Sequence, residues 1–211
     1  MFKLANTFLG KIVMKNFDVA VLGAGPGGYI AAIRAAQLGK KVAIIEADKL
    51  GGVCLNRGCI PTKALLKAAH AVHELATMKD LGIQVELKGL NGGQAVKRAK
   101  DISERISKGV AHLMKKNKIE VIEGTGHFSD SKTIEIKTNA GEKVKVSAAH
   151  FIISTGAKYK TFPGIEHDGK RLLGAWEAVK LEALPKSVGI IGAVAIGVEF
   201  AYFWNAFGVE V

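Results

Sequence analysis

Residues 17–46 read FDVAVLGAGPGGYIAAIRAAQLGKKVAIIE, and this stretch decides the fold. Its first six residues are a short apolar run that ends at a glycine, which predicts a buried strand. Residues 29–38 place apolar side chains at helical spacing and stop at Gly39, a natural helix end. Residues 41–46 predict a second buried strand. Strand, turn, helix and strand in this order indicate a βαβ unit, and therefore an α/β fold.

The turn between the first strand and the helix has the pattern G-x-G-x-x-G, with glycines at 23, 25 and 28. In a dinucleotide-binding turn the first glycine allows the tight turn, the second lets a pyrophosphate approach the backbone, and the third lets the helix pack closely on the strand. The helix N-terminus offers unpaired N–H groups to the phosphates. Glu46 ends the second strand, where an acid that binds a ribose belongs. The alternative is a turn that is tight only for packing.

The rest of the chain continues the α/β pattern and ends on a second strand–turn–helix start. After a loop over residues 48–58, apolar spacing predicts helices over residues 61–78 and 94–116. Shorter helices are expected over residues 176–184 and 195–207. Apolar runs predict further strands at residues 83–87, 119–123, 133–137, 143–146, 150–154, 188–191 and 209–211.

Composition excludes several classes of protein. The chain has 211 residues, of which 48% are hydrophobic and 23% charged, so it can form a packed core. Two cysteines are too few for a disulfide-rich secreted scaffold, and without a Cys/His cluster we expect no metal site. The net charge of +11 would suit a nucleic-acid partner. The lysines of residues 97–116 alternate with acids, however, as on a solvated helix face, so we expect no nucleic-acid binding.

Two segments require a check for targeting or membrane insertion. Residues 188–209 are almost wholly apolar and near the length of a spanning helix. Glu199 and four glycines interrupt them, which favours a strand, turn and helix over a membrane span. Residues 1–15 hold lysines and no acids, so they are either a targeting peptide or an extension ahead of Met14. A bacterial cytoplasmic location is expected in preference to the mitochondrial matrix.

Cys54 and Cys59 place two thiols with four residues between them, just before a helix. They could be buried and inert, they could form half of a metal site whose other half is missing, or they could be a redox pair. A thiolate near a helix N-terminus is stabilised, which lowers its pKa and makes it a nucleophile. Thiol–disulfide exchange needs such an attacking thiol and a second thiol that resolves the mixed disulfide.

Residues 51–63, GGVCLNRGCIPTK, closely resemble the redox-active segment of the class I pyridine nucleotide–disulfide oxidoreductases. Leu-Asn ahead of Gly-Cys, and Ile-Pro-Thr-Lys after it, are most similar to the dihydrolipoamide dehydrogenase branch. The resemblance extends from about Asn16 to the end of the chain. It implies a Rossmann-like FAD-binding domain with a βαβ unit and added antiparallel strands, followed by the truncated start of a second Rossmann-like domain that binds NAD.

The resemblance also implies a set of residues for FAD. The glycine turn would contact the pyrophosphate, Glu46 the adenosine ribose, and a lysine after the cysteines the flavin. A glycine of residues 123–128 would lie near the adenine, and residues 154–157, STGA, resemble the segment that closes the site. The implied FAD-binding residues are Gly23, Gly25, Gly28, Glu46, Lys63, Gly126, Thr155, Gly156 and Ala157.

In the chemistry that the resemblance implies, Cys54 and Cys59 form a redox-active disulfide. Cys54 exchanges with the lipoyl disulfide, and Cys59 lies against the flavin and passes electrons to it. FAD then reduces NAD⁺. The overall reaction oxidises dihydrolipoamide on the lipoyl-bearing acyltransferase or carrier subunit of a 2-oxo acid dehydrogenase complex. Full-length family members are expected to be homodimers.

A second, weaker resemblance concerns NAD. Gly192, Gly197 and Glu199 are similar to the start of the family's NAD domain, but Val194 stands where the middle glycine of the motif belongs. Family members run to more than twice this length. We therefore expect an extension over residues 1–15, an FAD domain over 16–160 and the start of an NAD domain over 161–211, in an incomplete fragment of low activity. A related disulfide reductase with another substrate and a non-catalytic FAD-binding remnant are the alternatives.

Overall fold

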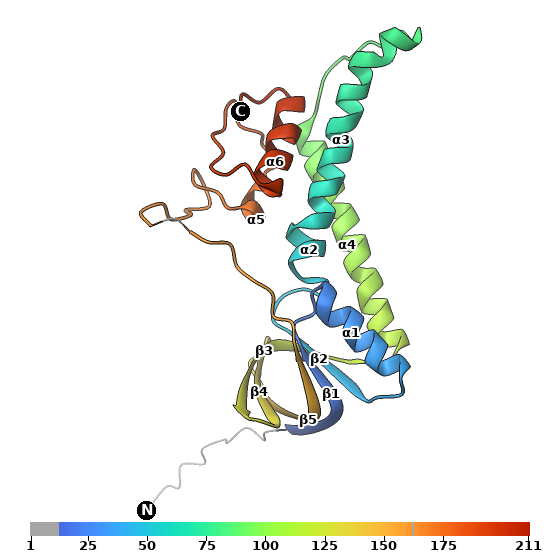
Figure 1. Cartoon of the computed structure of the whole chain (residues 1–211), viewed down its shortest axis with the longest axis vertical. Coiled ribbons are helices and arrows are strands. Elements are labelled where there is room, and N and C mark those ends of the chain that lie inside the picture. Colours follow the sequence, from blue (N-terminus) through green and yellow to red (C-terminus); the bar gives the residue numbers. More distant parts are fainter. Residues whose placement is uncertain (1–12, 162) are drawn as a thin grey trace, which may run out of the picture. The chain divides into compact units, whose positions relative to one another are not determined.

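The computed structural model describes residues 13–161 and 163–211 (Figure 1). These residues form two compact units. The first unit comprises the described residues up to Gly52, together with Gly109–Gly156. The second comprises Val53–Lys108 and Ala157–Val211. Most of the extension predicted over residues 1–15 lies outside the described residues. The division into domains at residues 16–160 and 161–211 stays a prediction.

The first unit is a closed five-stranded barrel in the order β1-β2-β3-β4-β5. Strand β1 pairs in parallel with both β2 and β5, and β2 pairs in parallel with β3. Strand β4 pairs in antiparallel fashion with β3 and β5. This arrangement confirms the predicted βαβ unit with added antiparallel strands. The elements are β1 (Val13–Leu22), α1 (Pro26–Gln37), β2 (Val42–Glu46), β3 (Glu120–Asp130), β4 (Thr133–Thr138) and β5 (Lys143–Ile153).

The barrel is filled by the apolar side chains that alternate along its strands, as period-2 patterning requires. In β4, for example, Ile134 and Ile136 are buried and the residues between and after them are not. The buried side chains that pack together there include Phe17, Leu22, Ile45, Ile122, Ile134, Ile136 and Val146. Because every strand has two neighbours, the barrel leaves no strand edge unpaired.

The second unit is mainly helical, and its core forms where apolar faces of α3, α4 and α6 meet. Leu65 and Ala69 of α3, Val96 of α4, and Phe203 and Trp204 of α6 are buried in this cluster. The elements are α2 (Gly52–Arg57), α3 (Cys59–Thr77), a 3₁₀ helix η1 (Met78–Leu81), α4 (Gly92–Lys116), α5 (Ala175–Ala178) and α6 (Ala195–Ala206), and residues 109–116 of α4 belong to the first unit.

Several predicted elements differ in the structure. The predicted loop over residues 48–58 contains the helix α2. Residues 83–87 form no strand, since they find no partner and all of them are exposed. The two strands predicted at 143–146 and 150–154 join into the single strand β5. The predicted helix over 176–184 is reduced to the four residues of α5.

The strands predicted at residues 188–191 and 209–211 are also wrong. Their region pairs only through one isolated parallel bridge between Ser187 and Glu210. Two backbone hydrogen bonds accompany the bridge, from Val188 N–H to Glu210 O and from Glu210 N–H to Lys186 O. Among the described residues, no helix is both long enough and apolar enough to cross a membrane.

Candidate functional site

In the first unit, the glycine turn after β1 is packed so tightly that two of its three glycines admit no side chain. Gly23 has a φ of 91°, which disfavours other residues, and a Cβ placed on it would overlap the carbonyl oxygen of Ser154. A Cβ on Gly28 would overlap Gly23 O and lie 2.6 Å from Ser154 Oγ. These contacts hold α1 closely against the ends of β1 and β5, as the motif predicts for its first and third glycines.

Gly25 differs from the other two glycines because its side-chain position is open. It caps the N-terminus of α1 with φ and ψ of −68° and −179°, a conformation open to any residue. A Cβ placed on it would meet nothing within 4 Å in the structure. A glycine that neither backbone angles nor packing require leaves room for a group outside the protein. The open backbone at a helix N-terminus fits the pyrophosphate of a dinucleotide.

Glu46 lies at the end of β2 and binds the glycine turn directly. Its Oε2 accepts a hydrogen bond from Ala24 N–H at 2.7 Å, and its Oε1 accepts one from Asp48 N–H at 2.9 Å. The carboxylate therefore ties β2 to the turn and aligns the loop that follows. This is the position that the sequence predicts for a ribose-binding acid, and binding of the ribose itself stays a prediction.

Ser154 is a site residue that sequence reasoning named only as part of a segment. Its N–H donates to Leu22 O at 2.8 Å, and its Oγ donates to the carbonyl oxygens of Leu22 and Gly23, each at 3.0 Å. Ser154 thus closes the glycine turn from the end of β5. Thr155 and Gly156, which were predicted for FAD, follow it and are exposed. Ala157, also predicted for FAD, is the first residue of the chain's return to the second unit.

Gly126 of β3 has a packing reason of its own. A Cβ placed there would lie 2.9 Å from Ile134 Cγ2, so a side chain would crowd the barrel interior. The predicted place of Gly126 near the adenine stays a prediction, since the packing alone accounts for the glycine.

In the second unit, Cys54 and Cys59 are brought together by a sharp corner between two helices. Cys54 lies in α2, Gly58 forms the corner, and Cys59 begins α3. A Cβ on Gly58 would lie 3.0 Å from Val53 O and 3.3 Å from Cys54 Cα, so glycine lets the chain fold back on α2. Neither thiol is in a disulfide, and Cys59 is close enough to Cys54 to affect the pKa of its thiol. The structure therefore pairs the cysteines in their dithiol form.

The environment of Cys54 raises the pKa of its thiol from 9.0 to about 11. Burial contributes most, and the side chain of Cys59 adds to the shift, while the backbone N–H of Cys59 and the charge of Lys63 oppose it. The N–H at the start of α3 lowers the pKa as expected, but burial and the Cys59 side chain outweigh it, so the expectation of a lowered pKa at Cys54 is wrong. In the dithiol form Cys54 is held as a protonated thiol, because desolvation disfavours its charged form.

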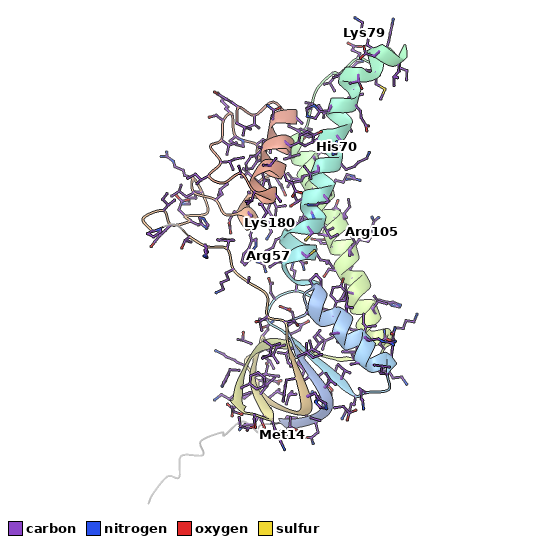
Figure 2. The ribbon with its side chains drawn as sticks, viewed as in Figure 1. Met14, Arg57, His70, Lys79, Arg105 and Lys180 are labelled. Atoms are coloured by element: carbon purple, nitrogen blue, oxygen red, sulfur yellow. The ribbon has the colours of Figure 1, made fainter. Side chains whose placement is uncertain are left out.

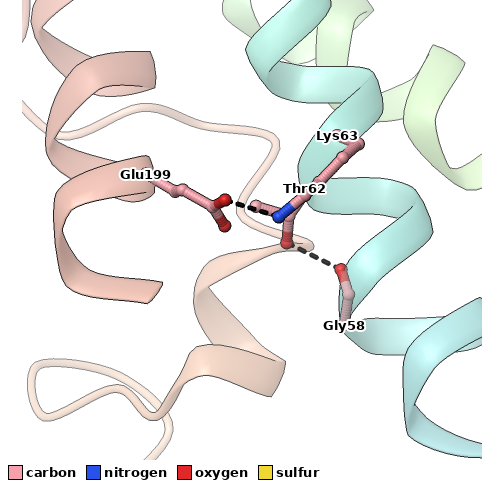
Figure 3. Close-up of polar contacts among 4 residues, drawn as sticks. All are labelled: Gly58, Thr62, Lys63 and Glu199. Carbon is pink, nitrogen blue, oxygen red and sulfur yellow. Dashed lines mark hydrogen bonds and ion pairs between the residues drawn. The ribbon is translucent and has the colours of Figure 1, made fainter. Parts of the chain in front are cut away.

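Polar contacts from α3 support this corner (Figure 3). Thr62 is buried, and its Oγ1 donates to Gly58 O at 2.7 Å. The next residue, Lys63, forms an ion pair of 2.5 Å between its Nζ and Oε1 of Glu199 on α6. The sequence predicts Lys63 for FAD and Glu199 for NAD, and the structure brings the two side chains together. Thr62 is a supporting residue that sequence reasoning missed, although its place one turn after Gly58 could have indicated it.

The second glycine turn, ahead of α6, repeats the close contact of the first. Gly192 has a φ of 114°, and a Cβ placed on Gly197 would overlap Gly192 O. Val194 caps the N-terminus of α6, and its side chain is 75% exposed. The turn therefore forms with valine at the middle position. In the described part of the chain, no group of three or more His, Cys, Asp or Glu side chains is placed to hold a metal ion.

A dinucleotide-type glycine turn in one unit and an apposed cysteine pair in the other define a dinucleotide-dependent disulfide oxidoreductase. The family model of the pyridine nucleotide-disulphide oxidoreductases matches residues 17–211, and the chain belongs to this family. The family implies FAD and a nicotinamide dinucleotide as cofactors. The open position at Gly25 and the alignment of the turn by Glu46 fit the phosphate-bearing part of such a cofactor.

The relatives identify the branch of the family. The chain is 43% identical over 196 residues to a dihydrolipoyl dehydrogenase of Zymomonas mobilis, covering 93% of this chain and 42% of that protein. It is 40% identical over 204 residues to a dihydrolipoyl dehydrogenase of Bacillus subtilis, and the match covers 93% of this chain and 43% of that protein. It is 41% identical over 199 residues to the mitochondrial one of Schizosaccharomyces pombe, covering 93% and 39%. The predicted resemblance is confirmed, and the chain corresponds to an N-terminal portion spanning about two fifths of these relatives.

The fold is also that of a solved relative. The crystal structure of LpdA from Mycobacterium tuberculosis superposes with a TM-score of 0.74 at 25% sequence identity. The match covers 83% of this chain and 39% of that one. The similarity confirms the Rossmann-like α/β fold expected from the sequence.

Proposed function

We propose that the chain performs the dithiol–disulfide step of a flavin-dependent oxidoreductase that converts dihydrolipoamide and NAD⁺ to lipoamide and NADH. The observation that carries the proposal is the pair of free cysteines Cys54 and Cys59, brought together by the α2–α3 corner at Gly58. The names of the relatives supply the substrate.

Cys54 and Cys59 carry out the exchange with the substrate. With the pair oxidised, a thiol of dihydrolipoamide attacks Cys54 and displaces the Cys59 thiol, giving a mixed disulfide. The second substrate thiol then attacks the substrate sulfur of that bond, which releases lipoamide and leaves Cys54 reduced. Two electrons and two protons have then passed from the substrate to the pair. FAD, when bound, would supply the electron acceptor for the reduced pair.

The other residues bind and orient. We propose Gly23, Gly25 and Gly28 for the FAD pyrophosphate, Glu46 for its ribose and Lys63 for the flavin side. Gly126, Thr155, Gly156 and Ala157 would complete the FAD site, and Gly192, Gly197 and Glu199 would contribute to NAD binding. The partner would be the lipoyl-bearing subunit of a 2-oxo acid dehydrogenase complex, with a homodimeric oxidoreductase. We propose a bacterial cytoplasmic location, because bacterial proteins are among the most similar relatives.

The test is to oxidise the reduced chain with lipoamide and count alkylatable thiols by mass spectrometry. We expect the wild-type chain to lose both thiols and to release dihydrolipoamide, while Cys54→Ser and Cys59→Ser release none. Two alkylated thiols after prolonged oxidation of the wild-type chain would contradict the proposal. Glutathione disulfide, tested in parallel, separates the alternative of a related reductase, for which it would be the better oxidant. FAD binding without any redox reaction of the cysteines would favour the non-catalytic remnant.

A further inference from the structure

The α2–α3 corner contacts an aromatic residue from a distant part of the chain, within the second unit. Arg57 is the last residue of α2 and is labelled in Figure 2. Its guanidinium carbon lies over the indole ring of Trp176 on α5, 4.6 Å from the ring centroid. A cation within about 6 Å of a tryptophan ring centroid is attracted by the negative face of the ring. The contact therefore ties α2 to α5.

Trp176 is itself held by its neighbours. The ring of Tyr159 meets it edge to face at 4.9 Å, and the ring of His167 lies 4.7 Å from that of Tyr159. Tyr159 OH donates to Oε2 of Glu177 at 3.3 Å, and the same oxygen accepts a hydrogen bond from Gly174 N–H at 3.0 Å. Packing and hydrogen bonds therefore hold α5 in place, in addition to its contact with Arg57.

The charge of Arg57 affects Tyr159, one of the residues that hold Trp176. Burial, followed by the charge and hydrogen bond of Glu177, raises the pKa of Tyr159, and the charge of Arg57 opposes that shift. The groups that act on Cys54 are Cys59 and Lys63. The guanidinium thus extends over Trp176.

That backbone is the corner that apposes the cysteines. Gly58 follows Arg57 directly and lies against Val53 O and Cys54 Cα. Disulfide formation requires the two Cβ atoms at about 3.5–4.5 Å, a window of one ångström. Because Gly58 follows Arg57 in the chain, a displacement of the Arg57 backbone would also displace Gly58 and alter the separation of the cysteines.

We propose that Trp176 is a positioning residue for the Cys54–Cys59 pair: it binds the Arg57 guanidinium and thereby holds the α2–α3 corner in the geometry in which the disulfide forms. The inference rests on the proposed function, since it requires that the pair cycles between dithiol and disulfide. In that cycle the two thiols lose two electrons and two protons, which reduce an acceptor disulfide to a dithiol.

The test measures the redox equilibrium of the pair in the full chain. The chain is equilibrated with oxidised and reduced dithiothreitol at set ratios, its thiols are trapped with iodoacetamide, and the disulfide fraction is measured by mass spectrometry. Trp176→Ala should lower the equilibrium constant for disulfide formation about tenfold, which corresponds to a midpoint potential about 30 mV more positive. Arg57→Met, which keeps a long apolar stem without the charge, should have a similar effect. Trp176→Phe should have a smaller one.

Lys170→Met is the matched control, because it removes an exposed cation of the same unit, and it should leave the constant unchanged. Indole fluorescence gives a second readout. The emission of the wild-type chain should change when the pair is oxidised, and Trp176→Phe should abolish that change while Trp204 still emits.

An unchanged constant in Trp176→Ala that folds as the wild type does, judged by circular dichroism, would overturn the proposal. If Trp176→Ala fails to fold, the test rests on Arg57→Met and Trp176→Phe. An equilibrium constant for disulfide formation equal to that of the wild-type chain in both variants would overturn the proposal. A wild-type chain that forms no disulfide refutes the proposed function, and this is visible without any variant. Disulfides of equal stability in all variants refute only the positioning role.

Discussion

Val194 has the backbone conformation of Gly25. Each residue caps the N-terminus of a helix after a glycine turn, with φ and ψ of −88° and 177° for Val194 and −68° and −179° for Gly25. These angles suit any residue, so valine strains no backbone there. What differs is the space in front of the helix, which is open at Gly25 and holds an exposed, χ1-restricted side chain at Val194.

We therefore expect Val194→Gly to strengthen NADH binding. In a dinucleotide turn the middle position faces the pyrophosphate, and relief of overpacking there is worth about 1–3 kcal/mol, or about 5- to 150-fold in affinity. Fluorescence titration with NADH checks this, both in the chain and in a hybrid that continues with the C-terminal part of the Zymomonas mobilis relative. FAD affinity should not change. Equal NADH dissociation constants for valine and glycine would show that the turn tolerates the side chain.

The two glycines Gly25 and Gly28 should respond in opposite ways to alanine. Gly28→Ala forces a methyl group onto Gly23 O, so we expect a loss of several kcal/mol of unfolding free energy or failure to fold. Gly25→Ala meets nothing within 4 Å and should change the unfolding free energy by less than about 0.5 kcal/mol. It should nevertheless weaken FAD binding at least tenfold. Urea unfolding and FAD titration separate the two effects, and tight FAD binding by Gly25→Ala would contradict the predicted phosphate site.

Glu46→Ala should destabilise the first unit through the glycine turn. It removes the charged acceptor of two backbone N–H groups, at Ala24 and Asp48. A hydrogen bond to a charged group is worth about 1.5–3 kcal/mol, and we expect a loss of about 2 kcal/mol in urea unfolding, since the site is only half buried. Glu104→Ala, on an exposed face of α4, is the control and should cost less than about 0.5 kcal/mol. Equal stability of the two variants would show that the carboxylate does not support the turn.

The raised pKa of Cys54 predicts slow alkylation of the reduced chain. With a pKa of about 11 instead of 9.0, about 100-fold less Cys54 thiolate is present at pH 8. A thiolate of higher pKa is more nucleophilic, which offsets about tenfold of this loss in the alkylation rate. Iodoacetamide should therefore modify Cys54 roughly tenfold more slowly than an ordinary thiol, with a rate that still rises at pH 10. In Cys59→Ser the pH midpoint of Cys54 alkylation should be lower than in the wild-type chain, because the charge and thiol of Cys59 are gone. Burial of Cys54 should still keep this midpoint above pH 9. A midpoint at or below 9 in the wild-type chain would contradict the environment described for Cys54.

The raised pKa of Cys54 also makes the free energy of unfolding depend on pH. Below pH 9 the Cys54 thiol is protonated in both the folded and the unfolded chain. Between about pH 9 and pH 11 only the unfolded chain loses this proton, so the free energy of unfolding falls as pH rises through that window. Urea midpoints measured from pH 8 to pH 10.5 should decline less steeply in Cys54→Ser than in the wild-type chain. Parallel declines would contradict the raised pKa.

Local sequence patterns predicted the elements that do not depend on distant partners. The strand, turn, helix and strand of residues 17–46 were predicted to within a few residues, because the glycine turn marks the helix start and Gly39 its end. The long helix α4 is also predicted, since its apolar face repeats from Val96 to Leu113, over about five turns. The cysteine pair was found from its run of residues alone, and the structure shows how Gly58 brings the two thiols together.

The rest depended on contacts that no local pattern contains. Helix α2 is only six residues long, below what is stable by itself, and it forms in the packed corner around Gly58. Residues 83–87 alternate as a strand would, but a strand needs a partner to take up its hydrogen bonds, and none is present. The raised pKa of Cys54 arises from burial and from Cys59, which a helix-terminus rule does not include.

The pairing of β1 with β5 sets an order of events during synthesis. Strand β1 is paired from Val13↔Val144 to Leu22↔Ile153, so the barrel cannot close until residue 153 has left the ribosome. At about 5–20 residues per second, Leu22 of β1 waits roughly 7–26 s for Ile153, the last of its partners. During that time the cysteine-bearing helices α2 and α3 emerge, after β2 and before β3. The two thiols are therefore made before Ser154, Trp176 and Glu199, the residues that close the glycine turn and support the dithiol corner.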